Sequence, residues 1–516
     1  MSPPPSSASA ATISPPALVG PKPGEARAGL AMSVATFAMA AASAIQAVLY
    51  LSSFGTSGRT DGFFVAFALY TTIGVFSQSL RLTSVPLIVE PGARLSLREY
   101  AAALGLIGIP LLIAAGLFAG PLASVLAPGL DAAGRDVTAS ALPVLGAATV
   151  LQLWAAGAAT VLAVRGRFNA IAGSYIAGAT AGLVAYLALS DAAGELVLGW
   201  SMLAMAVVTC GWMLAATRVS GGLGPARGDL RLSALLTKTG VILGRTAIYL
   251  AFNVLFVITL SYASHAAVGD ATVLSYAYLF ASYLVAGTGM ALGMSRIPEM
   301  TRGARAERRA VVRETVPQGF RYAMLLVAPA LAGLITAGAP LIHELFPSSL
   351  NAAGVTSLRE FAALLAAWTL AALLVNFLLP AMFALGRARL VNTLAAPLLV
   401  LHVAATAAGS KLLGVEGAVA AFFVAPACFG ALLLAMGGDG AGRALAREMG
   451  GDALRFVALA AAAFGIGELV GTAVASGLAA AVLTGVIGSA LYGAGLVLVA
   501  RRQVLVLVRT LRPVKA

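Results

Sequence analysis

Charged side chains inside long apolar stretches are the first candidates for chemistry in this chain. Arg81 lies well inside one apolar stretch, and Glu468 stands alone in another. Placing a charge in hydrocarbon costs about 2.5–3.5 kcal/mol on insertion scales, so each side chain must face water, pair with an opposite charge or snorkel to the interface. A guanidinium can hold a phosphate through two parallel hydrogen bonds, and burial favours the neutral form of a carboxyl. Arg81 is therefore a candidate phosphate ligand, and Glu468 a candidate coupling group.

Further polar residues lie where apolar stretches begin. Asp61 follows a glycine-rich turn and Thr60, an N-cap candidate. Asp61 could cap its helix, pair with Arg59 or form an outer gate that reforms between states. Arg245 opens another stretch, and Asn253 follows two helical turns later, so both could point into a cavity from one face. Alternatively, Arg245 anchors the start of its helix at the membrane surface.

Amide side chains complete the candidate site. Gln46, Gln78, Gln152 and Asn376 lie within apolar stretches, where they could line a hydrated cavity or hydrogen-bond between helices. The histidines and the two cysteines show no ligand spacing, so we expect no metal, no cofactor and no disulfide framework. The substrate-binding candidates are Arg81, Arg245, Asn253, Gln46 and Gln78, and the gating or coupling candidates are Asp61, Arg59 and Glu468.

Composition shows what must position these residues. Of 516 residues 60% are hydrophobic and only 10% charged, and the mean hydropathy is +0.94. A soluble core could not bury so much apolar surface, so lipid must solvate most of it, through helices of about 20 apolar residues each. We predict an all-α polytopic membrane protein with about fourteen transmembrane helices. The expected helices cover residues 29–53, 62–88, 101–126, 137–163, 168–189, 193–217, 239–263, 271–297, 319–346, 361–385, 390–409, 412–436, 454–475 and 479–500.

The positions of the basic residues predict the orientation. Lys and Arg fall mainly in alternate connectors, for example Arg165 with Arg167 and Arg387 with Arg389, whereas the other connectors are mostly acidic. By the positive-inside rule the basic connectors and both termini face the cytoplasm, as an even number of spans requires. We expect a multi-pass protein of a bacterial inner membrane. The net charge of +13 then indicates anionic membrane lipids, not nucleic acid, as the partner of the basic loops.

An internal repeat organises the helices. AVRGRFNAIAGSYIAG (163–178) returns in outline as ALGRARLVNTLAAPLL (384–399), about two hundred residues later. The unit is six spans, and an even number makes the two copies parallel, with a cavity between two bundles. The expected parts are a disordered cytoplasmic tail (1–28), an N-terminal bundle (29–217), a cytoplasmic linker (218–238), a C-terminal bundle (239–436), a cytoplasmic loop (437–453), an appended helix pair (454–500) and a basic cytoplasmic tail (501–516).

Several strings carry a resemblance to a known family. FGTSGRTDGFFVAFAL (54–69), FSQ (76–78), VP (85–86) and GMALGMSRIP (289–298) resemble the MurJ/MviN lipid-linked oligosaccharide flippases of the multidrug/oligosaccharidyl-lipid/polysaccharide (MOP) exporter superfamily. The resemblance covers roughly residues 29–436. It implies alternating-access transport of a lipid-linked envelope sugar, such as a lipid II-like peptidoglycan precursor, and a functional role for Asp61. Arginines that line the family's cavity correspond here to Ala40, Gln46 and Leu279.

Three other functions compete with a flippase. An enzyme is not expected, because the outer loops are short and none brings together a nucleophile and a base. A multidrug or cation antiporter of the same superfamily predicts acidic cavity residues in the first half, and spans one to six have none away from their ends. A transport-inactive envelope scaffold would fit the missing arginines and the Pro-rich tail. We expect a monomeric flippase of lipid-linked sugars, with cell-wall synthesis proteins as further candidate partners.

Overall fold

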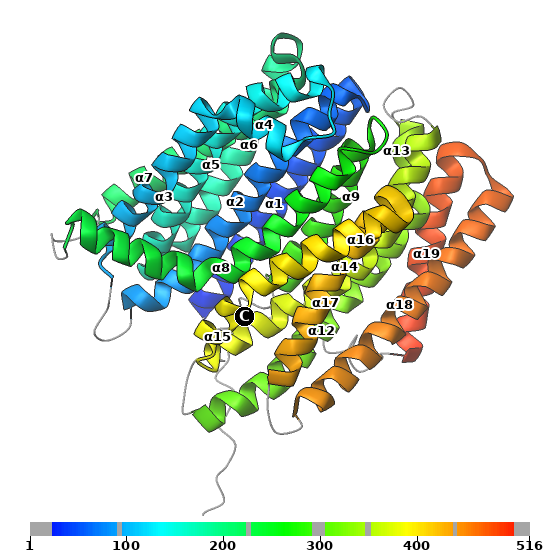
Figure 1. Ribbon diagram of the computed structural model, residues 1–516. Helices are drawn as coiled ribbons and strands as arrows, with labels where there is room; N and C mark the ends of the chain where they lie inside the picture. The colour runs from blue at the N-terminus through cyan, green and yellow to red at the C-terminus, as the bar shows by residue number, and fades with distance from the viewer. Residues whose placement is uncertain are drawn as a thin grey trace, which may run out of the picture.

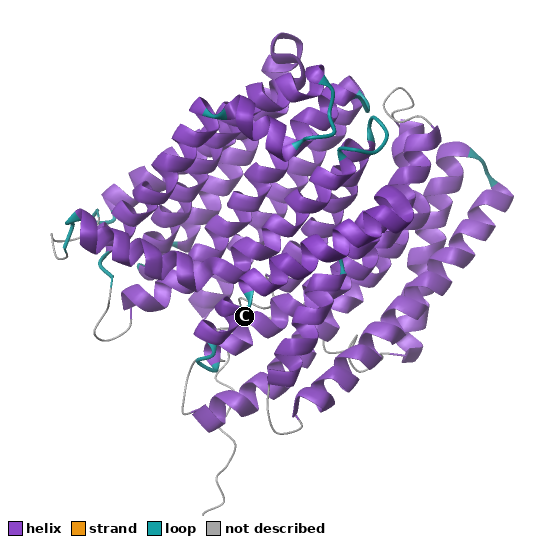
Figure 2. Ribbon diagram, viewed as in Figure 1, coloured by secondary structure: helices purple, strands orange, loops and turns teal. Residues whose placement is uncertain are grey.

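The structure, a computed structural model, describes residues 23–89, 95–222, 229–290, 305–345, 352–436 and 441–499. Within these ranges the chain forms helices and connecting turns, with no β-strand. Figure 1 shows long, roughly parallel helices, and Figure 2 shows the short loops that join them. Ten helices in the described ranges are long and apolar enough to cross a membrane. The prediction of an all-α, multi-pass membrane protein is confirmed.

The helices follow the predicted spans in order. The first half contains α1 (Pro23–Phe54), α2 (Gly58–Val89), α3 (Leu97–Leu117), α4 (Ala119–Leu126), α5 (Ala132–Val164), α6 (Phe168–Ala193), the 3-10 turn η1 (Gly194–Leu196) and α7 (Val197–Val219). The second half contains α8 (Leu232–Ala263), α9 (Asp270–Leu284), the π-helix η2 (Val285–Met290), α12 (Arg305–Gly333), the π-helix η3 (Leu334–Gly338), α13 (Ala339–Leu345), α14 (Ala352–Ala384), α15 (Ala388–Thr393), α16 (Ala395–Ala421) and α17 (Val424–Met436). The appended pair is α18 (Ala441–Val474) and α19 (Gly477–Val499).

Several helices extend past the apolar segments that were predicted to form them. Helix α8 begins at Leu232 inside the predicted linker, and α18 begins at Ala441 inside the predicted cytoplasmic loop. Helix α1 likewise begins at Pro23, inside the segment expected to be a disordered tail. Backbone hydrogen bonding continues where side chains become polar, so hydropathy locates the membrane-embedded part of a helix and not its ends. Residues 1–22 and 500–516 lie outside the described ranges.

The internal repeat is visible in matching turns. Gly166 and Gly386 have φ angles of +69° and +77°, and in both turns the N–H of the following arginine donates to a helix carbonyl five residues back, at 2.9 Å. This left-handed glycine with a long backward bond is a helix C-terminal motif that favours glycine. A second pair, Gly194 and Gly414, has φ angles of +54° and +66° and the same separation along the chain. Equivalent glycines therefore close equivalent helices in the two halves.

Helix packing gives the two halves and their connection. Helices α1, α2, α5, α6 and α7 pack together in the first half, and α8, α9, α14, α16 and α17 in the second. The backbones of α2 and α5 approach so closely that a Cβ on Gly62 would lie 2.0 Å from the Gly134 carbonyl oxygen. Helix α8 contacts both halves, packing on α2 and α3 and also on α16. The appended α18 and α19 pack on each other and, through α18, on α12.

Candidate functional site

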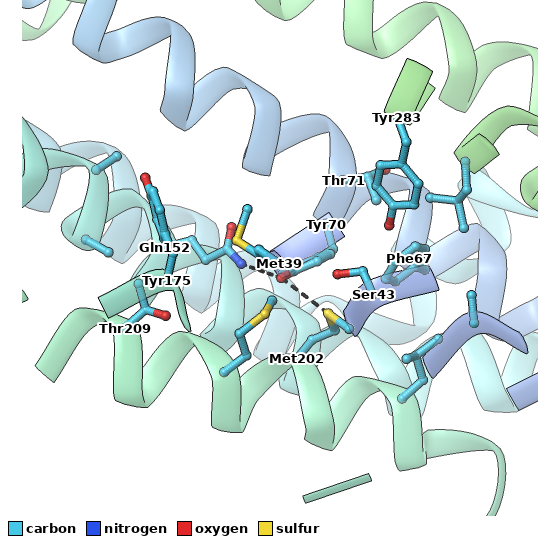
Figure 3. A pocket seen from close by; sticks show the side chains of 16 residues that line it. Met39, Ser43, Phe67, Tyr70, Thr71, Gln152, Tyr175, Met202, Thr209 and Tyr283 are labelled. Atoms are coloured by element: carbon cyan, nitrogen blue, oxygen red, sulfur yellow. Dashed lines mark hydrogen bonds between the residues drawn. The ribbon is translucent and has the colours of Figure 1, made fainter. Parts of the chain in front are cut away.

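A cavity of about 130 Å³ lies within the first half and is closed on one side by α9. Its walls come from α1, α2, α5, α6 and α7, with Leu279 and Tyr283 of α9 completing them. Figure 3 shows side chains converging on it from these helices. Tyr70 lies 12 residues after the start of α2, about 18 Å along the helix, which is near the middle of a hydrocarbon core of about 30 Å. The cavity is therefore at the depth expected of a transport site.

Hydrogen-bonding groups in this cavity are uncharged. The Gln152 side-chain amide donates to the Tyr70 hydroxyl at 2.5 Å, and that hydroxyl lies 3.6 Å from the Met202 sulfur. Ser43 and Tyr283 contribute two further hydroxyls to the lining. None of the 16 lining residues drawn in Figure 3 is Asp, Glu, Lys, Arg or His. The cavity offers hydroxyl, amide, aromatic and thioether groups, and no formal charge.

Gln46 lies next to this cavity but not in its lining. Its side chain is only 1% exposed, and neither amide atom has a hydrogen-bonding partner among the described residues. A Cβ on Gly182 of α6 would lie 3.1 Å from the Gln46 amide nitrogen and 3.2 Å from the Cβ of Met205, which does line the cavity. The hydroxyl of buried Ser201 also has no partner in the described part of the chain. Unpaired polar atoms thus lie directly behind the cavity wall.

Asp61 joins the two halves at one end of the molecule. Its carboxylate accepts hydrogen bonds from the Gly269 N–H at 2.7 Å, the Thr272 N–H at 2.7 Å and the Thr272 hydroxyl at 2.6 Å. Gly269 and Thr272 are at the N-terminus of α9, where the helix dipole and free N–H groups favour an anion. Burial raises the pKa of this carboxyl above its ordinary value, and the three hydrogen bonds oppose that shift. A residue of one half therefore caps a helix of the other.

Other contacts close the same end. The Tyr276 hydroxyl of α9 donates to the Ala47 carbonyl of α1 at 2.8 Å, and its ring lies 5.0 Å from that of Phe64. The N–H of Gly129 donates to the Ser264 hydroxyl at 3.3 Å, joining the turn before α5 to the end of α8. We call this the Asp61 end. The opposite end, where α5 finishes beside Arg165, is called the arginine end.

Near Asp61, two predicted partnerships are replaced by others. Arg59 pairs with Glu195 of η1 at 2.8 Å and not with Asp61. The N-cap of α2 is provided by Ser57, whose hydroxyl accepts from the Thr60 N–H, while the Thr60 hydroxyl accepts from the Ser57 N–H. Asp61 is therefore not needed to cap its own helix and is free to cap α9. Of the three alternatives for Asp61, the structure shows neither capping of α2 nor pairing with Arg59, because Ser57 and Thr60 cap α2 together and Glu195 pairs with Arg59.

Arg245 and Asn253 do not line the described cavity. The side-chain amide of Asn253 donates to the Tyr249 backbone carbonyl of its own helix at 2.7 Å. The backbone carbonyl of Asn253 accepts from the Thr72 hydroxyl of α2 at 3.2 Å. The Arg245 carbonyl accepts from a side chain of α15 at 3.2 Å. Roles for both residues in substrate binding remain predictions. The side chains of Arg81 and Gln78 lie outside the described residues, so their roles also remain predictions.

The sequence suggested that Glu468 is isolated within its apolar stretch, but the structure gives it a partner. Its carboxylate accepts from the Arg359 guanidinium at 2.6 Å, which joins α18 to α14. The sequence could not show this pair, because the two residues are far apart along the chain. Compensation by a cation removes the reason for expecting a neutral carboxyl there. Its coupling role remains a prediction.

Sequence reasoning missed a polar junction at the arginine end. Glu99 at the start of α3 pairs with Lys238 of α8 and accepts from the Asp229 N–H at 2.7 Å. Ser96 and Glu99 also form a reciprocal capping box. The S-x-x-E spacing before an apolar run was a signal for the cap. The pairing with Lys238 had no local signal, because it depends on α8 packing against α3.

Comparison with solved structures defines the fold. No family model and no curated protein matches the sequence. The structure of the lipid II flippase MurJ in an inward closed conformation superposes with a TM-score of 0.71 at 13% identity, over 92% of this chain and all of that one. The chain has the fold of the MOP-superfamily transporters.

Other members of the MOP fold are less similar. A MOP-superfamily transporter from Pyrococcus furiosus gives a TM-score of 0.58 at 14% identity, over 82% of this chain and 96% of that one. A eukaryotic MATE transporter gives 0.53 at 13% identity, over 84% and 99%. Identities this low establish the fold. The substrate must be argued from the residues of this chain.

Proposed function

We propose that this protein is an alternating-access transporter that flips a lipid-linked envelope sugar across the bacterial inner membrane. The junction at the Asp61 end is the observation that carries the proposal. It connects two halves through a few polar contacts, beside a cavity at the depth of the bilayer. Such a junction can break and reform as rigid bundles rock against each other. Opening it would expose the cavity to that side of the membrane.

The orientation follows from the basic residues. Arg165, Arg167 and Arg387 lie in the turns that close equivalent helices at the arginine end, and Arg389 lies in the first turn of α15. The positive-inside rule places this end and both termini in the cytoplasm. The Asp61 end then faces outward, and the described state is closed to the outside. A substrate loaded from the cytoplasm would leave when the Asp61 junction opens.

The choice of substrate rests on two supports. Among the superposed structures, the lipid II flippase gives a TM-score of 0.71 over 92% of this chain, while the MATE transporters give lower scores over less of the chain. The sequence strings around Asp61 resemble those of lipid-linked oligosaccharide flippases. A lipid II-like peptidoglycan precursor or a related polysaccharide intermediate is therefore the proposed cargo. Arg81, toward the arginine end of α2, is the proposed phosphate contact.

A multidrug or cation antiporter is the rival function, since MATE transporters share the fold. Cation binding in a membrane cavity favours a carboxylate. The apolar segments that line the described cavity contain no Asp or Glu by sequence. This observation favours the flippase. Transport of either kind needs no catalytic group, so the proposal includes no enzymatic step.

Cross-linking the outer junction tests the proposal. The hydroxyl oxygens of Thr60 and Thr272 lie 3.2 Å apart, so cysteines at both positions should form a disulfide. The full chain, with Cys210 and Cys428 replaced by alanine, would be reconstituted in liposomes that contain a polyprenyl-diphosphate-linked sugar. Oxidation of Thr60→Cys/Thr272→Cys should stop sugar translocation, and a reductant should restore it.

Each single-cysteine variant serves as a control and should transport equally before and after oxidation. Sugar translocation that continues through the cross-linked junction would overturn alternating access at this end. A parallel measurement of dye efflux driven by a cation gradient distinguishes the rival. Dye efflux without sugar movement would establish the antiporter, and neither activity would establish a scaffold.

A further inference from the structure

The helix segments that surround the cavity carry no charged side chain. Residues 29–53, 62–80, 137–163, 168–190, 196–217 and 271–288 contain no Asp, Glu, Lys, Arg or His. These segments supply every residue of the lining. The absence of charge is therefore a property of the sequence around the cavity and holds in any conformation that keeps these helices together.

A phosphate could not enter such a site without a large cost. An ionised group moved from water into a low-dielectric site without a counter-ion loses several kcal/mol, even after local relaxation. The backbone of Arg81 lies ten helical residues beyond Thr71, which is about 15 Å along α2. A quaternary ammonium group would find aromatic faces in the lining but no carboxylate to balance its charge. The group that fits is uncharged.

The walls match one particular kind of uncharged group. Hydroxyl and amide groups come from Ser43, Tyr70 and Gln152, and flat apolar surface comes from Phe67. A sugar ring carries hydroxyls around its edge and C–H groups on its faces. Its hydroxyls can hydrogen-bond to the hydroxyl and amide groups of the wall, and its faces can pack on the aromatic ring of Phe67. A cavity of about 150 Å³ holds one benzene molecule, so a cavity of about 130 Å³ sets an upper limit of about one ring and excludes a disaccharide. A hexose has more atoms than benzene and would place its ring inside and some of its hydroxyls at the opening.

We propose that this cavity receives a single uncharged sugar ring of the transported lipid, bound by Tyr70 and Gln152, while the phosphate stays outside it. The proposal rests on the flippase function and specifies which part of the substrate enters the first half. Existing hydrogen bonds support it, because the Gln152 amide and the Tyr70 hydroxyl already hold each other in place. Preorganised polar groups lose less entropy when a ligand binds.

Binding of three probes with the same tail tests the assignment. The full chain in nanodiscs would be titrated calorimetrically with hexyl β-glucoside, hexyl phosphate and hexyl trimethylammonium. The glucoside should bind at the cavity, and Gln152→Ala or Tyr70→Phe should each weaken it about tenfold, the value of one hydrogen bond of about 1.4 kcal/mol. Binding of hexyl phosphate should be the same in the variants as in the native chain.

A matched control separates local from general effects. Thr180→Ala removes a hydroxyl from the exposed face of α6, where it donates to the Ile176 carbonyl of its own helix, and should leave all three affinities unchanged. Tyr70→Phe keeps the ring, so its melting temperature should show that the fold is retained. Glucoside binding that is unaffected in both cavity variants, or displaced by hexyl phosphate, would overturn the proposal.

Translocation assays on the same variants distinguish this proposal from the flippase function itself. If sugar binding depends on Gln152 but no lipid is translocated, the cavity assignment stands and the flippase function fails. If lipid is translocated normally by Gln152→Ala and Tyr70→Phe, the flippase function stands and the cavity assignment fails.

Discussion

The side-chain amide of Asn392 is hydrogen-bonded into the backbone of α8, where its oxygen accepts the Ile248 N–H at 3.1 Å. Its nitrogen donates to the Arg245 carbonyl at 3.2 Å. In a regular helix the Ile248 N–H would donate to the Gly244 carbonyl, and a side chain inserted into this ladder bends a helix. The part of α8 that precedes Arg245 packs on α3, and the part that follows Ile248 packs on α16. Asn392 therefore holds α8 where it passes from one half to the other.

Replacing Asn392 should loosen this connection. Asn392→Ala removes both bonds to α8 and should lower stability by about 1–3 kcal/mol, because buried backbone groups lose their partners. The thermal unfolding midpoint in detergent would measure the change. Thr393→Ala is the control, since that exposed hydroxyl bonds only to the Leu390 carbonyl of its own helix. Equal midpoints for the two variants would show that Asn392 does not hold α8.

Gly129→Ala should favour the state that is open at the Asp61 end. A Cβ on Gly129 would lie 2.3 Å from the Ser264 carbonyl oxygen, and this contact joins the two halves. The clash exists only while that end is closed. Spin labels at exposed Ser53 and Ala267, in a chain lacking native cysteines, should report a longer distance in the variant. Gly120→Ala, which meets nothing within 4 Å, should leave the distance unchanged. A closed distance in Gly129→Ala would contradict the assigned gate.

The closed state should become more populated as the pH falls. Burial raises the pKa of Asp61 in the closed state, whereas an opened, hydrated carboxyl returns to its ordinary value. The closed state therefore binds a proton more tightly, and it gains stability as the pH falls through the raised pKa. The same spin labels should report more of the short distance at pH 5 than at pH 8. Asp61→Asn should remove this dependence, and a pH response that persists in Asp61→Asn would assign it to another group.

Gln46→Leu should stabilise the protein and impair transport. The Gln46 amide is buried without partners among the described residues, which costs about 1–3 kcal/mol in this state, and leucine of similar volume removes that cost. A polar group kept at such a cost beside the cavity is expected to be used in another state. The variant should melt higher and translocate sugar more slowly. A higher midpoint with undiminished transport would leave Gln46 without a functional role.

Much of the architecture could be read along the chain. Apolar stretches of membrane length and the repeated glycine–arginine turns depend on local composition, so they predicted the helices and the repeat. Helix ends were less predictable, since α8 and α18 continue into polar sequence. Helix α16 is broken by non-helical backbone at Leu413 and Gly414, where Gly414 has a φ of +66°, so the break falls a few residues after the boundary predicted between the spans 390–409 and 412–436.

The candidate site was only partly predictable. Asp61 was identified as a gate candidate from its position, but its partners Gly269 and Thr272 were not, because they come from the other half. Arg59 was identified as a possible partner of Asp61 and Glu468 as a charge that needs compensation, and the structure pairs them with Glu195 and Arg359. The sequence did not identify Tyr70 and Met202 as cavity residues, because tyrosine and methionine within an apolar helix are typical of an ordinary core.

The sequence by itself determined that the chain is a membrane protein and that its helices alternate with basic and acidic turns. It also determined that the segments lining the cavity contain no charged residue. These are properties of composition and of short-range periodicity. Tertiary structure decided which residues meet: Asp61 with Thr272, and Asn392 with Ile248. Contacts between residues hundreds of positions apart depend on how helices cross, and that is fixed by packing between whole bundles, which no local pattern of residues encodes.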